Sequence, residues 1–357
     1  ILHYDAHGEQ ASTLDWLETN GRISAAEKTE FTKYVPNTNS TFFQYVVNEG
    51  KMNLVGRDVL AVNQQGHTYS GDTPVSVFAN KGEITGLNDL TTSGYSSVRQ
   101  TVFAFLESGN TPGREQIFDN TASGKIELRA PESIVYNIGS NYDRVHSASF
   151  FNSGSIKMYG LKNVGVYTAG AYTGYSPSAG LAKPGRIVFD TPIEILGDQS
   201  IGIDLERPIN GAQSKINLKI GGEGNSYSGN AGIGYDPSLV EESTGLYYKL
   251  TAGGANTLVT LDDYLIKADS YSKKSYLVRV EDGTLTLGDG NSTNNSGKNQ
   301  LIESDGGIEN VLLAAIGKTA KLVTDGDITV NALNGVRQTG IYAGDFSTTP
   351  SNGGGKI

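Results

Sequence analysis

Apolar residues recur along the chain in short pairs separated by one residue, and the pairs return at a nearly constant interval. Segments 124–128, 154–158 and 185–189 share the form Gly-x-Ile-x-apolar, and 50–54 carries Met in place of Ile. The first apolar positions of four successive copies are Ile126, Ile156, Ile187 and Ile216. Their steps of 30, 31 and 29 residues predict an internal repeat of about 30 residues.

A second apolar pair follows the first at a fixed offset of eight and ten residues. Ile156, for example, is followed by Val164 and Val166. Alternation within a pair sends side chains to one face of a strand, so each unit predicts a strand, a corner and a second strand. Asn-x-Gly precedes several units, as at 80–82 and 152–154, and we expect corners there whose backbone needs positive φ.

Glycine followed by an aliphatic residue and then Tyr or Asp is a third recurring element, at 165–167, 202–204, 245–247 and 340–342. We expect it to close the second strand of a unit. A unit of this size cannot bury its apolar face alone, whereas stacked neighbours form one core. The sequence therefore favours an all-β fold, a right-handed parallel β-helix (β-solenoid), in which the four isoleucines above form an internal ladder.

Two regions depart from the repeat. Residues 12–34 contain better helix formers, and Ser24 to Glu27 resembles a capping box. Because open solenoid ends need covering, we expect residues 1–44 to form an N-terminal cap with a short helix and residues 45–357 to form the β-helix. Residues 221–256 are rich in Gly, Ser and Tyr with little alternation, which predicts a long lateral loop.

Composition narrows the possible partners. The 357 residues carry a net charge of −10, which disfavours binding to nucleic acid or to an anionic membrane surface. The chain has no Cys, so disulfides, thiol catalysis and zinc-thiolate sites are excluded. The apolar run 311–316 is too short to span a bilayer, and we expect no membrane contact by this segment itself.

The acidic and histidine residues form no complete catalytic or metal motif, and we expect no cofactor. Asp262-Asp263 and His67 superficially match polygalacturonase motifs, but in reversed order, and a turn after 257–261 is the favoured interpretation. A polysaccharide-degrading enzyme therefore stays the less favoured alternative. Weak metal binding stays open at two places, the alternating His and acidic residues of 3–9 and the imperfect EF-hand-like loop 289–300.

The tyrosine content points to a recognition surface. The chain has 19 Tyr against a single Trp. Tyrosine is a rigid amphipathic contact residue at protein and sugar interfaces, especially among small polar residues. Candidate ligand-binding residues in segment 165–185 and in the predicted loop are Tyr167, Tyr172, Tyr175, Tyr227 and Tyr235. The alternative is that these tyrosines only cover the flanks of the solenoid.

The repeats resemble a known family. Segment 152–167, Asn-Ser-Gly-Ser-Ile-Lys-Met-Tyr-Gly-Leu-Lys-Asn-Val-Gly-Val-Tyr, is similar to the passenger repeats of the very large fusobacterial autotransporter adhesins. The resemblance covers residues 45–220 well, 280–345 loosely, and the first 40 hardly at all.

This resemblance implies a non-enzymatic adhesin segment that is secreted to the bacterial cell surface. A C-terminal β-barrel outside this sequence would anchor it in the outer membrane. The implied partners are a host cell-surface glycan or protein receptor, or other bacterial cells. The alternative is a structural spacer of a large passenger, with binding located elsewhere. The chain starts at Ile1, so we expect it to be a piece of a longer protein.

Overall fold

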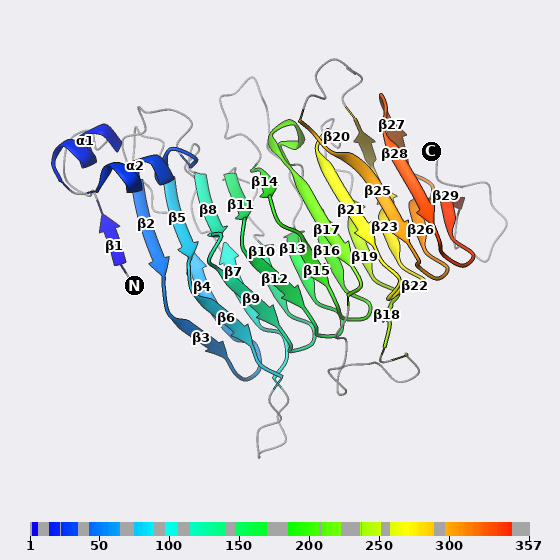
Figure 1. Cartoon of the computed structure of the whole chain (residues 1–357), viewed down its shortest axis with the longest axis horizontal. Helices are drawn as coiled ribbons and strands as arrows, with labels where there is room; N and C mark the ends of the chain where they lie inside the picture. Colours follow the sequence, from blue (N-terminus) through cyan, green and yellow to red (C-terminus); the bar gives the residue numbers. More distant parts are fainter. Residues whose placement is uncertain are drawn as a thin grey trace.

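The chain forms an elongated stack of β-coils that runs from the N-terminal to the C-terminal end in the computed structural model (Figure 1). The structure describes residues 2–5, 14–21, 23–34, 43–64, 75–88, 97–105, 115–139, 147–169, 185–206, 209–222, 236, 238–250, 258–288 and 297–344. Each coil pairs its strands in parallel with the coils before and after it, as in the first coils of the second sheet. The architecture is the predicted all-β parallel solenoid.

Three long sheets form the sides of the coils. The first sheet has, in spatial order, β1 (Leu2–Asp5), β2 (Phe43–Asn48), β5 (Val75–Asn80), β8 (Glu115–Asn120), β11 (Ser147–Asn152) and β14 (Ile187–Phe189). The second has β3 (Lys51–Leu54), β6 (Glu83–Gly86), β9 (Lys125–Leu128), β12 (Ser155–Met158), β15 (Ile193–Ile195), β17 (Ile216–Ile220), β21 (Tyr264–Ala268), β25 (Gln300–Asp305) and β28 (Thr329–Leu333). The third has β4 (Leu60–Gln64), β7 (Thr101–Phe105), β10 (Ile134–Gly139), β13 (Val164–Ala169), β16 (Ile201–Leu205), β19 (Thr244–Lys249), β23 (Tyr276–Asp282), β26 (Val311–Ile316) and β29 (Thr339–Gly344).

Smaller elements complete the stack. In the N-terminal coils, each strand of the third sheet is followed along the chain by a strand of the first sheet. In the C-terminal coils a fourth sheet takes that place. It comprises β20 (Leu258–Leu261), β24 (Thr284–Leu287) and β27 (Lys321–Thr324). One corner pairs β18 (Val240–Glu241) with β22 (Ser272–Lys273). The helical elements of the described residues are α1 (Leu14–Thr19), α2 (Ala25–Phe31) and the 3₁₀ turn η2 (Gly211–Gln213).

The internal ladder of the second sheet confirms half of the predicted isoleucine stack. Ile126 and Ile156 are paired and fully buried. Ile156, however, pairs with Ile193, while Ile187 lies in the first sheet beside Phe150. The ladder reads Met52, Ile84, Ile126, Ile156, Ile193, Leu218, Ile266, Ile302 and Val330. The predicted places of Ile187 and Ile216 were wrong because the resemblance of 185–189 to the earlier units does not set the pairing register.

The glycines at the Asn-x-Gly corners allow neighbouring coils to pack closely, and they do not adopt positive φ. Gly82 is outside the left-handed region, but a Cβ there would lie 2.0 Å from the carbonyl oxygen of Gly50 in the preceding coil. The asparagines form a buried ladder in which each amide donates to the next, from Asn48 through Asn80 and Asn120 to Asn152, over 2.8–2.9 Å. The predicted corners are confirmed, and their predicted backbone conformation was wrong.

Left-handed backbone recurs instead at one position of the corner between the second and third sheets, where all but one of the residues that adopt it are charged. These residues, one in each coil, are Asp58, Arg99, Glu132, Lys162, Gln199, Glu242, Lys274, Glu309 and Arg337. Acidic and basic side chains alternate from coil to coil at this corner, and only Gln199 interrupts the alternation. Neighbouring coils can therefore form ion pairs, as between Arg99 Nε and Asp58 Oδ1 over 2.6 Å. Because side chains at this corner point to solvent, opposite charges on neighbouring coils favour the native stacking register.

The N-terminal helices pack on the side of the solenoid. The predicted capping box is confirmed, since Ser24 caps α2 and the Glu27 carboxylate accepts from the Ser24 backbone. Helical residues and Tyr34 form a second apolar cluster with Tyr45, Val77 and Ile117 of the first sheet. Tyr34 also donates to the buried Asp119 over 2.5 Å. The helices thus cover an outer sheet face, while β1 pairs antiparallel with β2 and covers the first edge of that sheet.

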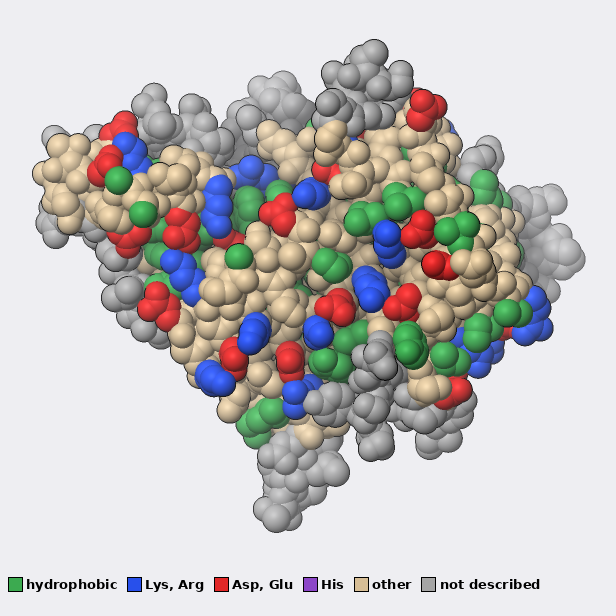
Figure 2. Space-filling model, in the orientation of Figure 1, with side chains coloured by type: hydrophobic (Ala, Val, Ile, Leu, Met, Phe, Trp, Pro, Cys, Tyr) green, Lys and Arg blue, Asp and Glu red, His purple; other side chains and the backbone are tan. Residues whose placement is uncertain are grey.

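Charges of both signs are dispersed over the outer surface. Figure 2 shows Lys and Arg interspersed with Asp and Glu over the face that it presents. On the second sheet, Glu127, Lys157, Glu194 and Lys219 occupy one register row, and Lys157 Nζ lies 3.8 Å from Glu194 Oε1. The acidic excess is therefore not gathered on this row. Among the described residues, no helix has the length and apolar character needed to cross a bilayer.

Candidate functional site

The Gly-aliphatic-Tyr/Asp elements build a row of side chains on the outer face of the third sheet. Tyr167 of β13 pairs with Asp204 of β16, Asp204 with Tyr247 of β19, and Tyr247 with Arg279 of β23. We call Tyr167, Asp204, Tyr247 and Arg279 the outer row. The repeated third position of the sequence element is thus one register position of the sheet, within the strands and not at their ends.

Local backbone packing fixes this direction. Val166 at the second position of the element is fully buried, whereas Tyr167 at the third is partly exposed. The preceding Gly165 approaches the neighbouring strand so closely that a Cβ would lie 2.4 Å from the carbonyl oxygen of Gly202. The glycine therefore allows the two strands to approach closely. Because side chains alternate along a strand, the residue after the buried Val166 points away from the core.

Asp204 is the unusual member of the outer row. Only 8% of its surface is exposed, and its Oδ1 has no hydrogen-bond partner among the described residues. Burial, reinforced by the nearby carboxylate of Glu206, raises the pKa of Asp204 to about 7. Lys249 opposes this shift, but no ion pair joins it to Asp204. Burial without a hydrogen-bond partner destabilises the ionised form of a carboxyl. Asp204 therefore lowers the stability of the fold near neutral pH.

Glu281 of β23 organises the next part of the surface. Its Oε2 accepts a hydrogen bond of 2.5 Å from the Tyr247 hydroxyl, and Lys249 Nζ lies 3.8 Å from the same oxygen. Arg279 pairs with the same carboxylate and places its guanidinium 5.1 Å from the ring centre of Tyr276 and 5.7 Å from that of Tyr247. These contacts compensate the charge of Glu281 and hold Tyr247 in place beside Asp204.

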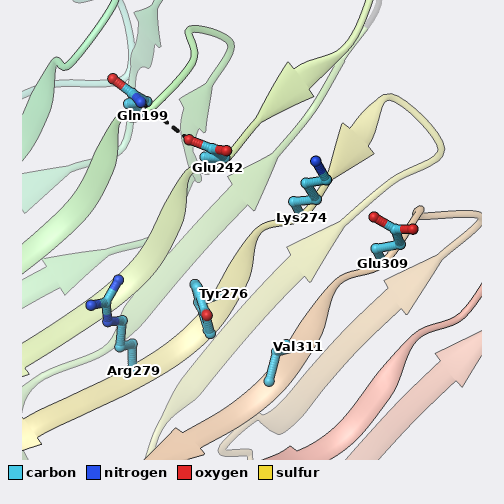
Figure 3. Close-up of a pocket in the computed structure, with 7 residues that line it drawn as sticks. All are labelled: Gln199, Glu242, Lys274, Tyr276, Arg279, Glu309 and Val311. Carbon is cyan, nitrogen blue, oxygen red and sulfur yellow. Dashed lines mark hydrogen bonds between the residues drawn. The ribbon is translucent and has the colours of Figure 1, made fainter. Parts of the chain in front are cut away.

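A shallow pocket of about 550 Å³ borders the outer row. Figure 3 shows Gln199, Glu242, Lys274 and Glu309 of the charged corner along one side, and Tyr276, Arg279 and Val311 of the third sheet along the other. Gln199 Nε2 donates to Glu242 Oε2 over 3.1 Å. The pocket combines one aromatic ring with charges of both signs, which suits a polar ligand held at a surface.

The structure describes one of the five candidate tyrosines. Tyr167 lies in the outer row, partly exposed, with a pKa raised by burial and by Glu206 and Asp204. The other candidates, Tyr172, Tyr175, Tyr227 and Tyr235, lie outside the described residues. The predicted loop 221–256 was wrong over part of its length. Segments 240–241 and 244–249 form β18 and β19, and β19 carries Tyr247 into the outer row.

Sequence reasoning did not assign Asp204, Arg279 or Glu281 to a site. The signal for Asp204 was present, since it occupies the third position of the same repeated element as Tyr167. No repeated element marks Arg279, because β23 contributes Leu-Val-Arg where the three preceding coils have Gly-aliphatic-Tyr/Asp. The pairing of β19 with β23 is what brings it beside Tyr247.

The acidic pair Asp262-Asp263 has a structural place. It forms the turn between β20 and β21, as predicted, and Asp262 Oδ2 lies 2.5 Å from Lys298 Nζ. Asp263 accepts from the backbone N–H of Asn299 over 3.0 Å. Within the described part of the chain, no three His, Cys, Asp or Glu residues form a cluster that could hold a metal ion. The candidate positions 7–9 and 289–296 lie outside that part.

Comparison of the chain with protein-family models, with curated proteins and with solved structures finds no match.

The raised pKa of Asp204 predicts a pH-dependent cost in stability that the substitution Asp204→Asn removes. The unfolded carboxyl loses its proton near pH 4 and the folded one near pH 7, so the folded state binds more protons between these values. The wild-type chain should lose roughly 2–4 kcal/mol relative to the variant as the pH rises from 4 to 8. Urea unfolding at both pH values measures the difference, and parallel behaviour of the two proteins would contradict it.

Proposed function

We propose that this chain is a non-enzymatic adhesin segment of a bacterial cell surface, which binds a partner through the outer face of its third sheet. The partner is a host cell-surface glycan or protein receptor, or another bacterial cell. The resemblance of the repeats to autotransporter passengers supports the cell-surface role, and the parallel solenoid is a suitable scaffold for an extended stalk.

Asp204 is the observation that carries the proposal. A buried carboxyl with an unpartnered oxygen, set between Tyr167 and Tyr247, lowers the stability of the fold. Local violations of packing rules are typical of functional sites, where a ligand supplies the missing partner. Tyrosines on either side add rigid contact area that loses little entropy on binding.

The test is binding of the intact 357-residue chain to epithelial cells, to other bacterial cells and to a glycan array. We expect saturable binding that the double substitution Tyr167→Ala, Tyr247→Ala weakens at least tenfold. Tyr271→Ala, which removes a tyrosine of similar partial exposure near β22, is the matched control and should bind as the wild type. Circular dichroism confirms that each variant is folded. Unchanged binding by the folded double variant would exclude the outer row as the binding surface.

The second candidate function is a structural spacer, and the regular rows of paired charges on neighbouring coils favour it. The charged corner and the second-sheet row satisfy most of their charges within the stack, as in the ion pairs of Arg99 with Asp58 and of Lys267 with Glu303. Such a surface resists non-specific association. Absence of binding to all three targets at high concentration would support the spacer and exclude the adhesin segment.

A further inference from the structure

We propose that Asp204 is the anchor of a subsite for a primary ammonium group, of the kind carried by a lysine side chain of a protein partner. This inference rests on the proposed function, because it names the chemistry that the outer row would recognise. Three observations carry it: the buried unpartnered carboxyl, the tyrosines on both sides of it, and the second carboxylate of Glu206 close by.

The carboxyl of Asp204 needs a donor that the described residues do not supply. Its Oδ1 is buried without a hydrogen bond. Lys249, whose charge acts on Asp204, lies within 4 Å of Glu281 and forms no ion pair with Asp204. A ligand ammonium that reaches Asp204 would form the missing charge-assisted hydrogen bond and remove the cost of the buried charge. The same contact favours the ionised carboxylate, so binding releases a proton near neutral pH.

The surroundings favour a cation over other ligands. Glu206 adds a negative charge on the strand of Asp204, while Arg279 and Lys249 are already paired with Glu281. The tyrosines at the flanking register positions can present ring faces to a cation, which stabilises a bound ammonium further. Since only 8% of Asp204 is exposed, a compact ammonium on a flexible stem fits better than a planar guanidinium or a sugar ring.

The test uses the full chain and three end-blocked Gly/Ser peptides that each carry one lysine, one ε-acetyl-lysine or one arginine. Binding is followed by ligand-observed nuclear magnetic resonance at pH 8 and pH 5. We expect the lysine peptide to bind at pH 8 at least tenfold more tightly than the acetylated peptide. At pH 5 the protonated Asp204 should bind the lysine peptide at least tenfold more weakly. The arginine peptide should also bind more weakly than the lysine peptide.

Two variants separate the carboxyl from general electrostatics. Asp204→Asn should lose the lysine preference, and its fold is expected to be at least as stable as the wild type near neutral pH. Asp325→Asn makes the same change of charge at an exposed position and should bind like the wild type. Equal binding of lysine and acetyl-lysine peptides, unchanged binding by Asp204→Asn, or no peptide binding at all would overturn the proposal.

The outcomes also separate this inference from the proposed function. Cell binding that persists in Asp204→Asn would leave the adhesin segment standing and overturn the ammonium subsite. Lysine-peptide binding without any cell or glycan binding would support the subsite and exclude the adhesin role. Competition by neutral methyl glycosides with no pH dependence would overturn the ammonium subsite and assign the outer row to sugars.

Discussion

Ile156→Asp should destabilise the solenoid by more than about 4 kcal/mol, the largest effect that we expect from a single core substitution. Ile156 is fully buried in β12, between Ile126 of the coil before and Ile193 of the coil after. An Asp there leaves an ionisable group in an apolar ladder without any partner. Because each coil is stabilised by its neighbours, the loss spreads to adjacent coils.

Urea unfolding followed by circular dichroism measures this effect. Ser155→Asp is the matched control, since Ser155 precedes Ile156 in β12 but is partly exposed beside Lys125. An acid at that outward position should change stability by less than about 0.5 kcal/mol. A normal unfolding curve for Ile156→Asp, or equal destabilisation by both variants, would contradict the internal ladder.

The alternation of apolar and polar side chains made the fold class predictable from the sequence. The pairing register of the strands was predictable only in part, because the coils differ in length. Ile126 and Ile156 were placed correctly because the coil between them contains 30 residues and no long insertion. The next coil runs 37 residues from Ile156 to Ile193, and the following one only 25 to Leu218. A constant period therefore misplaced Ile187, since strand pairing, and not the count of residues, sets which side chains stack.

The candidate site was predictable only in part, for a related reason. The repeated Gly-aliphatic-Tyr/Asp element marked Tyr167 and Asp204 as equivalent positions, but sequence alone gave no sign that Asp204 would be buried without a partner. Burial of a side chain on the outer face depends on neighbours from other coils. Arg279 and Glu281 entered the site through the pairing of β19 with β23, which spacing could not reveal.

Asn120→Asp should cost about 2–4 kcal/mol although it changes no volume. Asn120 is fully buried, accepts from Asn80 Nδ2 over 2.8 Å and donates to Asn152 Oδ1 over 2.9 Å. The substitution keeps the first bond but replaces the donor amide with an oxygen that faces another oxygen. Repulsion between the two acceptors destabilises the carboxylate and raises the pKa of the Asp. The Asp is therefore protonated more readily, and the variant is more stable at low pH.

The asparagine ladder can be tested by the same substitution at an exposed site. Asn53→Asp lies on the outer face of β3 and should leave the unfolding midpoint in urea nearly unchanged. For Asn120→Asp, the loss of stability should shrink as the pH falls from 7 to 4, because a protonated Asp regains a donor for Asn152. A loss of stability of similar size at both pH values would mean that the hydrogen bond donated by the Asn120 amide does not stabilise the ladder. Equal stability of Asn120→Asp and Asn53→Asp would show that the ladder contributes nothing to holding the coils together.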